Sequence, residues 1–227
     1  MKLLNEQSLA ATLDALNEAL FFNKPIPLND KKIVAAWLAG RQGLPGSYAG
    51  MFAPTSKDFK EHVRLFTGEK VTSGAATSHI LGEETCRTLI LLKDSRKIIA
   101  QKLQLAQDGI YARIRESESG NRVNGMYCCG ICSVSMWRNL AAGGFRQQAR
   151  RLKAGLEALK AHRDGNGRWR RFPFYYTLLA LSEINTSQAR DELQYAAPVC
   201  QRLLSRQTGN GIYVRRRKAI LEKSLTL

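Results

Sequence analysis

The sequence predicts an all-α protein built from repeated helical hairpins. Apolar residues recur at helical spacing along most of the 227 residues, and alternations typical of strands are short. Loops that combine glycine with an aromatic residue recur after successive predicted helices. We expect an N-terminal helical segment over residues 1–30 and a hairpin-repeat region over 31–227, in a single domain overall.

Each predicted helix follows from its apolar stripe. In chain order, the stripes predict helices around 9–20, 33–38, 73–92, 96–107, 127–140, 150–161 and 174–184. The 174–184 segment is apolar on almost every side, so this helix should lie inside the fold.

The loops carry the repeat. Four of them combine Arg or Gln, then Gly, then an aromatic residue, and they lie at 37–48, 105–111, 161–169 and 204–213. Glycine suits a left-handed helix C-cap, and the aromatic ring can pack back onto the helix pair. Successive aromatic residues are 63, 58 and 44 positions apart, which is enough for two helices per repeat. Chance similarity among glycine-rich turns is the alternative.

Two of these loops resemble a known family. Gln-Asp-Gly-Ile-Tyr at 107–111 and Arg-Asp-Gly-Asn-Gly-Arg-Trp at 163–169 are similar to repeat loops of the terpenoid cyclase and protein prenyltransferase superfamily. Over about residues 31–215, the resemblance implies an α/α toroid, in which inner helices surround an apolar cavity. The chain is short for a complete ring, so we expect a partial toroid or a homodimer. Neither the Asp-rich acid motif of the cyclases nor the Asp-x-Cys zinc pair of the prenyltransferases occurs here.

Composition limits the partners and the compartment. The net charge is +16, and residues 146–227 alone hold 17 basic and 6 acidic side chains. Nucleic acid, a phosphorylated ligand and an anionic membrane surface are therefore all plausible partners. No secretory signal and no apolar stretch of membrane-spanning length is found, and the five cysteines are an odd number. These features predict a cytoplasmic protein with reduced thiols.

The cysteine cluster is the first candidate site. Cys128, Cys129 and Cys132 lie within five residues, and on a helix Cys128 and Cys132 would share one face. Thiolates at this spacing can bind zinc or form a redox pair, although a closed zinc site needs further ligands. A buried helix face that packs closely against a neighbour is the alternative.

A second candidate lies in the predicted helix over 73–92. His79, Glu83 and Cys86 fall on one helical face, and His79 and Glu83 are the catalytic candidates. Any of the three could complete the thiolate zinc site if the two helices are adjacent. A surface or capping interaction is the alternative for the His–Glu pair, and Glu84 is expected to be solvated.

Basic and aromatic residues alternate in the segment 168–176. Arg170, Arg171, Tyr175 and Tyr176 are candidates for ligand binding, since Arg forks suit phosphate oxygens and the following helix start could add its amides. The rings of Trp169 and Phe174 are expected to pack in the core. The cationic run 215–218 predicts either an anionic partner or a solvated helix end.

These observations leave catalysis and binding both open. The leading hypothesis is a toroid protein that encloses an apolar or amphipathic, isoprenoid-like and phosphorylated small molecule. As an enzyme it would be of prenyl-transfer or cyclase type and zinc-dependent. The alternative is a basic helical-repeat protein that binds nucleic acid through its C-terminal half, or a scaffold without a small-molecule ligand.

Overall fold

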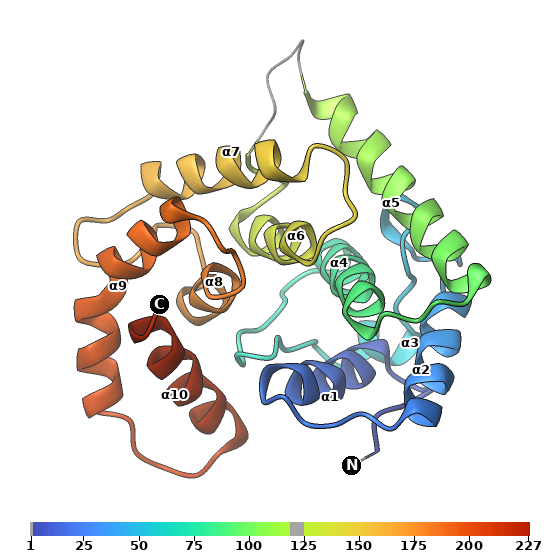
Figure 1. Ribbon diagram of the computed structural model, residues 1–227, viewed down its shortest axis with the longest axis horizontal. Coiled ribbons are helices and arrows are strands. Elements are labelled where there is room, and N and C mark those ends of the chain that lie inside the picture. The colour runs from blue at the N-terminus through green and yellow to red at the C-terminus, as the bar shows by residue number, and fades with distance from the viewer. Residues whose placement is uncertain (1, 119–124) are drawn as a thin grey trace. The chain divides into compact units, whose positions relative to one another are not determined.

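The chain is all-helical. The computed structural model describes residues 2–118 and 125–227, which form ten α-helices and one 3-10 turn (Figure 1). Within those ranges there is no strand, only isolated β-bridges, so the predicted all-α class is confirmed. None of the helices found there is long and apolar enough to cross a membrane.

The chain divides into two compact units. The first comprises Met1–Leu65, Lys70–Gly120 and Ala142–Arg146, and the second comprises Phe66–Glu69, Asn121–Ala141 and Gln147–Leu227. The short segment 66–69 thus packs with the second unit although its neighbours in sequence belong to the first.

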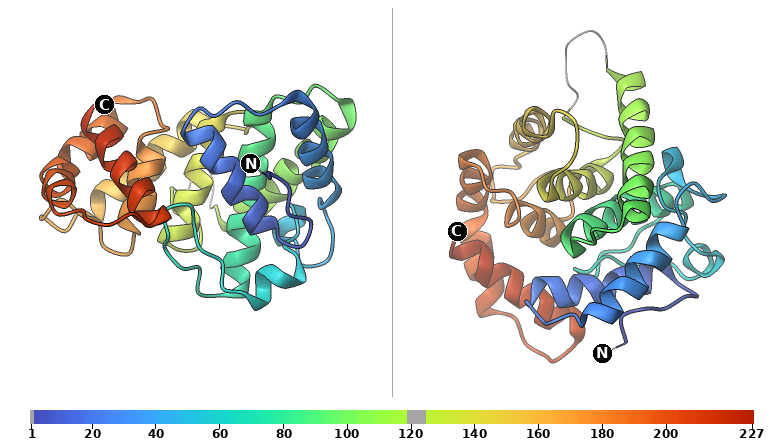
Figure 2. Two further views of the ribbon diagram at one scale, coloured as in Figure 1. Left: turned by 90° about the horizontal axis from the view of Figure 1, so that it is seen from below. Right: turned by 45° about the vertical axis from the view of Figure 1, so that its right-hand side comes forward.

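The first unit is organised around one long buried helix. Its helices are α1 (Leu9–Phe21), α2 (Leu28–Gly40), α3 (Ser56–Lys60), α4 (Gly74–Leu92) and α5 (Lys97–Ser117), with a 3-10 turn at Tyr48–Gly50. Helix α4 contacts all the others of this unit and buries most of its side chains (Figures 1 and 2). The start of α1 is fixed by Asp58, whose carboxylate accepts the amides of Leu9 and Ala10 at 3.0 and 3.1 Å.

The second unit places a short apolar helix among longer amphipathic ones. Its helices are α6 (Gly130–Ala142, all but its last residue), α7 (Gln148–Ala161), α8 (Phe174–Leu181), α9 (Ser187–Ser205) and α10 (Ile212–Leu225). Helix α8 is buried along nearly its whole length, as its composition predicts, and contacts α9 and α10 (Figure 1). Trp137 of α6 stacks on Phe172 with ring centroids 5.5 Å apart, which fixes the loop that leads into α8.

The structure corrects the predicted repeat loops. The loops after α2 and α7 are real, and each is closed by one antiparallel bridge, Gln42 with Phe52 and Arg163 with Trp169. The predicted loop at 105–111 is wrong, because α5 runs without interruption from Lys97 to Ser117. In the last copy the loop follows α9, but its aromatic residue Tyr213 already lies in the first turn of α10.

Candidate metal centre

The cysteine cluster lies at the start of helix α6. The predicted single helical face is wrong, because α6 begins only at Gly130, after Cys128 and Cys129. A turn gathers the thiols instead. Cys128 adopts the left-handed conformation, with φ of 61°, and the sulfur atoms of Cys128 and Cys132 lie within 4.8 Å of each other.

Two features fix this turn. Ser133 is buried, and its hydroxyl accepts the amide of Tyr127 at 2.8 Å while lying 2.8 Å from the carbonyl oxygen of Cys129. At Gly130, a Cβ would overlap the carbonyl group of Arg171, so only glycine permits the close approach of that loop. The start of α6 is therefore held from two sides.

The thiols influence one another electrostatically. Burial raises the pKa of Cys132 well above its ordinary value, and the neighbouring Cys129 and Cys128 raise it further. Burial also raises the pKa of Cys128, with a further contribution from the charge of Cys129. Each thiolate that forms therefore makes the next one harder to form, unless a cation neutralises them.

The geometry suits a soft divalent cation. Zinc–sulfur bonds are about 2.3 Å long, so two thiolates on a tetrahedral zinc ion lie about 3.8 Å apart. Cys128 and Cys129 are exposed, and rotation of such side chains can close the gap between the sulfur atoms. The positive end of the helix dipole at the start of α6 also favours thiolates. Cys132, Cys128 and Cys129 can thus supply three of the four ligands.

The second candidate constellation lies on α4 in the first unit. His79 Nε2 is 3.7 Å from Glu83 Oε1, both side chains are buried, and the His79 ring stacks on Tyr48 with centroids 4.7 Å apart. Cys86 is fully buried nearby, where burial first and the charge of Glu83 second raise its pKa. The shared face is confirmed, and the surface alternative for this pair is wrong because the pair is buried.

Glu84 also departs from its expected place. It is buried and not solvated, because its carboxylate accepts Asn17 at 3.3 Å and lies 3.9 Å from Arg87. If α4 supplied a further ligand to the cysteine cluster, the site would need side chains from both units. This hypothesis stays a prediction.

The predicted ligand-binding residues are in two different environments. Arg170 and Arg171 are exposed, and Arg171 has a positive φ of 67°. Tyr176 is fully buried beneath the guanidinium of Arg138, 5.4 Å from its ring centroid, whereas Tyr175 is only partly buried. Trp169 and Phe174 are buried, as the sequence predicts.

The cationic run 215–218 is not a solvated helix end. It lies in the first half of α10, where Arg216 is buried over the Phe66 ring and donates to the Phe66 carbonyl oxygen at 3.2 Å. Arg217 donates to Thr67 O at 2.8 Å and covers the Tyr175 ring. Two of the four cationic residues therefore hold the segment 66–69. In the sequence, the only indication of this role is the run of consecutive basic residues at 215–218.

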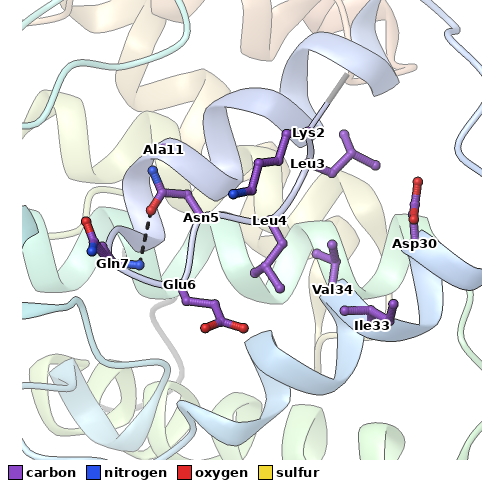
Figure 3. A pocket seen from close by; sticks show the side chains of 10 residues that line it. All are labelled: Lys2, Leu3, Leu4, Asn5, Glu6, Gln7, Ala11, Asp30, Ile33 and Val34. Carbon is purple, nitrogen blue, oxygen red and sulfur yellow. Dashed lines mark hydrogen bonds between the residues drawn. The ribbon is translucent and has the colours of Figure 1, made fainter.

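One pocket lies apart from these residues. It opens in the first unit between the N-terminal segment and α2 (Figure 3), and its lining is Lys2, Leu3, Leu4, Asn5, Glu6, Gln7, Ala11, Asp30, Ile33 and Val34. The charged lining residues are of both signs, and the sequence analysis assigned none of this set to a candidate site.

Comparison with known proteins adds no assignment. No family model matches this chain, and neither a curated protein nor a solved structure matches it.

Proposed function

We propose that this chain is a zinc-binding helical protein and that Cys128, Cys129 and Cys132 hold the ion. The observation that carries the proposal is the approach of the Cys128 and Cys132 sulfur atoms to within 4.8 Å at the start of α6, with the exposed Cys129 in the same turn. Thiolate is a ligand type that zinc prefers, and a bound cation offsets the burial and the neighbouring thiolate charge that raise the pKa values of Cys128 and Cys132.

The alternatives account for the geometry less well. Close packing explains Cys132, which is buried, but not Cys128 and Cys129, which are exposed. A redox pair requires a thiol whose pKa is lowered toward neutrality, because the thiolate is the nucleophile. Here the pKa values of Cys128 and Cys132 are raised.

Metal analysis of purified protein tests the proposal. After dialysis against a zinc buffer, we expect one zinc ion per chain in the wild type, and an absorption band from sulfur-to-metal charge transfer when cobalt replaces zinc. Cys128→Ser and Cys132→Ser should each lower the zinc affinity at least about tenfold, because a neutral hydroxyl is a much weaker ligand than thiolate.

Cys200→Ser is the matched control. Cys200 is a buried cysteine of α9 in the same unit, so its variant should keep both the zinc and the cobalt band. Unchanged zinc content in the Cys128 and Cys132 variants would contradict the proposal. The same assay on His79→Ala tests the separate prediction that α4 supplies a ligand.

The wider proposal places this ion in a toroid protein. The hairpin loops after α2 and α7 support this wider proposal. Each loop is closed by one β-bridge in which an aromatic residue, Phe52 or Trp169, takes part. In this proposal the helices form a partial ring around an apolar or amphipathic ligand, with prenyl transfer or cyclisation as the catalytic version. Native mass spectrometry, compared with the denatured mass, should then reveal a bound lipid. A polypeptide with zinc alone would contradict the enclosed ligand but not the metal site.

A further inference from the structure

Two arginines from distant parts of the second unit cover adjacent aromatic rings at the start of α8. The guanidinium carbon of Arg168 lies 4.4 Å from the ring centroid of Phe174, and that of Arg217 lies 4.7 Å from the ring centroid of Tyr175. The two rings are themselves 5.5 Å apart and meet edge to face. Stacking of this kind restrains a guanidinium group before any ligand binds.

The hydrogen-bonding capacity of this group is largely unused. Within residues 2–118 and 125–227, neither Arg168 nor Arg217 forms an ion pair with a carboxylate, and the Tyr175 hydroxyl makes no hydrogen bond. Arg217 donates one hydrogen bond, from its Nε to the carbonyl oxygen of Thr67. The terminal nitrogens of both arginines and the phenol remain available as donors.

The local field is positive despite one nearby carboxylate. Burial raises the pKa of Tyr175, whereas the charges of Arg217 and then Arg168 lower it, and the smaller effect of Glu69 raises it. Burial raises the pKa of the Cys200 thiol to about 11, and the charge of Arg168 opposes this shift. The phenol of Tyr175 therefore senses both guanidinium groups.

Glu69 has a separate role. Its Oε1 accepts the amide of Tyr176 at 3.2 Å, which occupies one of the free amides at the start of α8. The expectation that the amides of this helix start would bind an anion is thus not met at Tyr176. The side chains above the rings are the remaining donors that the contacts bring together near this helix start.

We propose that Arg168, Arg217 and Tyr175 form a binding site for the phosphoryl group of a small molecule. Two guanidinium forks and one hydroxyl can donate to the three terminal oxygens of a phosphate monoester, and a planar fork suits phosphate geometry better than an ammonium group does. The aromatic rings of Phe174 and Tyr175 offer an apolar surface beside it. This site is independent of the proposed zinc centre.

Calorimetric titration with inorganic phosphate and with phenyl phosphate tests the proposal. We expect saturable binding of both at one site per chain, with phenyl phosphate binding more tightly because its ring can pack on the aromatic surface. Tyr175→Phe keeps the ring and removes only the hydroxyl, so it should weaken binding about tenfold while the fold persists. Arg168→Gln and Arg217→Gln should weaken it at least about tenfold each.

Arg206→Gln is the matched control. Arg206 is an exposed arginine just after α9 that forms no ion pair within the described ranges, so this variant should bind within about twofold of the wild type. Circular dichroism of each variant checks the fold, and Tyr175→Phe keeps the test decisive should Arg217→Gln unfold.

Other outcomes would overturn the proposal. No saturable phosphate binding in the wild type, or equal weakening by Arg206→Gln, would show general attraction of anions to a basic chain. Binding to vesicles that contain phosphatidic acid, without binding of either free phosphate, would assign the arginines to a membrane surface. Binding of a single-stranded oligonucleotide without binding of phosphate or phenyl phosphate would assign them to nucleic acid.

Discussion

Single charged residues in the loops of this protein can stabilise the fold through hydrogen bonds. Asp164 is an example. Its Oδ1 accepts the amides of Asn166 and Arg168 at 2.8 and 3.1 Å and the hydroxyl of Tyr195 at 3.1 Å. These hydrogen bonds shape the loop between α7 and α8, which also positions Arg168 for the proposed phosphate site.

This carboxylate makes stability depend on acid pH. The amides of Asn166 and Arg168 lower the pKa of Asp164 below its ordinary value of about 3.9, because they donate to the ionised form. A group with a lowered folded-state pKa stabilises the fold above its unfolded-state pKa, and this contribution is lost as the pH falls through the folded-state value.

We therefore expect the advantage of the wild type over Asp164→Asn to shrink as the pH drops from 6 toward 3. Urea unfolding of both proteins across this range measures it. Asp191→Asn, at an exposed aspartate whose side chain forms no hydrogen bond or ion pair in the described structure, should differ from the wild type by the same small amount at each pH. A pH-independent difference for Asp164→Asn would contradict the role of the charge.

The candidate residues show which single-residue predictions the sequence supports. Cys128, Cys129 and Cys132 could be named as candidate ligands from the sequence because residues close in sequence stay close in any fold. Tyr175 was found as part of an aromatic segment, but its partner Arg217 comes from another helix, and no local pattern connects the two. Glu84 was misjudged because its burial depends on Asn17, which is far away in sequence.

At the scale of elements, apolar periodicity located the helices better than turn chemistry did. The stripes over 73–92 and 174–184 correspond to α4 (Gly74–Leu92) and α8 (Phe174–Leu181), because these helices are buried on most sides and carry a strong apolar signal. The glycine in the 105–111 segment predicted a loop that does not exist. Gly109 instead lies inside α5, where a Cβ would overlap the carbonyl oxygen of Ala49.

Packing geometry thus requires glycine at position 109, because a Cβ there would overlap the backbone of Ala49. We expect Gly109→Ala to destabilise the protein by about 1–3 kcal/mol, because overpacking against the backbone outweighs the better helix propensity of alanine. Gly40→Ala is the control, since no atom lies within 4 Å of a Cβ added at this glycine of α2. It should be neutral or stabilising by up to about 1 kcal/mol.

Chemical denaturation of the two variants decides this point. If Gly109→Ala were as stable as Gly40→Ala, the contact between α5 and the turn at Tyr48–Gly50 would have to be looser than the structure has it.

At the scale of the whole molecule, composition predicted the net charge but not the structural roles of the individual basic residues. The predicted toroid depends on how many hairpins follow one another, and a short loop motif cannot count them, as the false copy at 105–111 demonstrates. The net charge of +16, by contrast, follows directly from the sequence. Some of the basic residues lie inside the fold, since Arg216 is buried and Arg138 forms an ion pair with Glu183 at 2.8 Å.

The remaining surface charge should bind nucleic acid weakly and with strong salt dependence. The association constant for a 20-nucleotide single strand, measured by fluorescence anisotropy between 50 and 200 mM salt, should fall with a log–log slope of about −2 or steeper, because each neutralised phosphate contributes about −0.7. Arg168→Gln should change this slope by less than the contribution of one neutralised phosphate, since diffuse attraction does not depend on one side chain. A slope near zero with retained affinity would instead indicate a dedicated site that reads bases, and the basic C-terminal part would then be a nucleic-acid-binding surface in its own right.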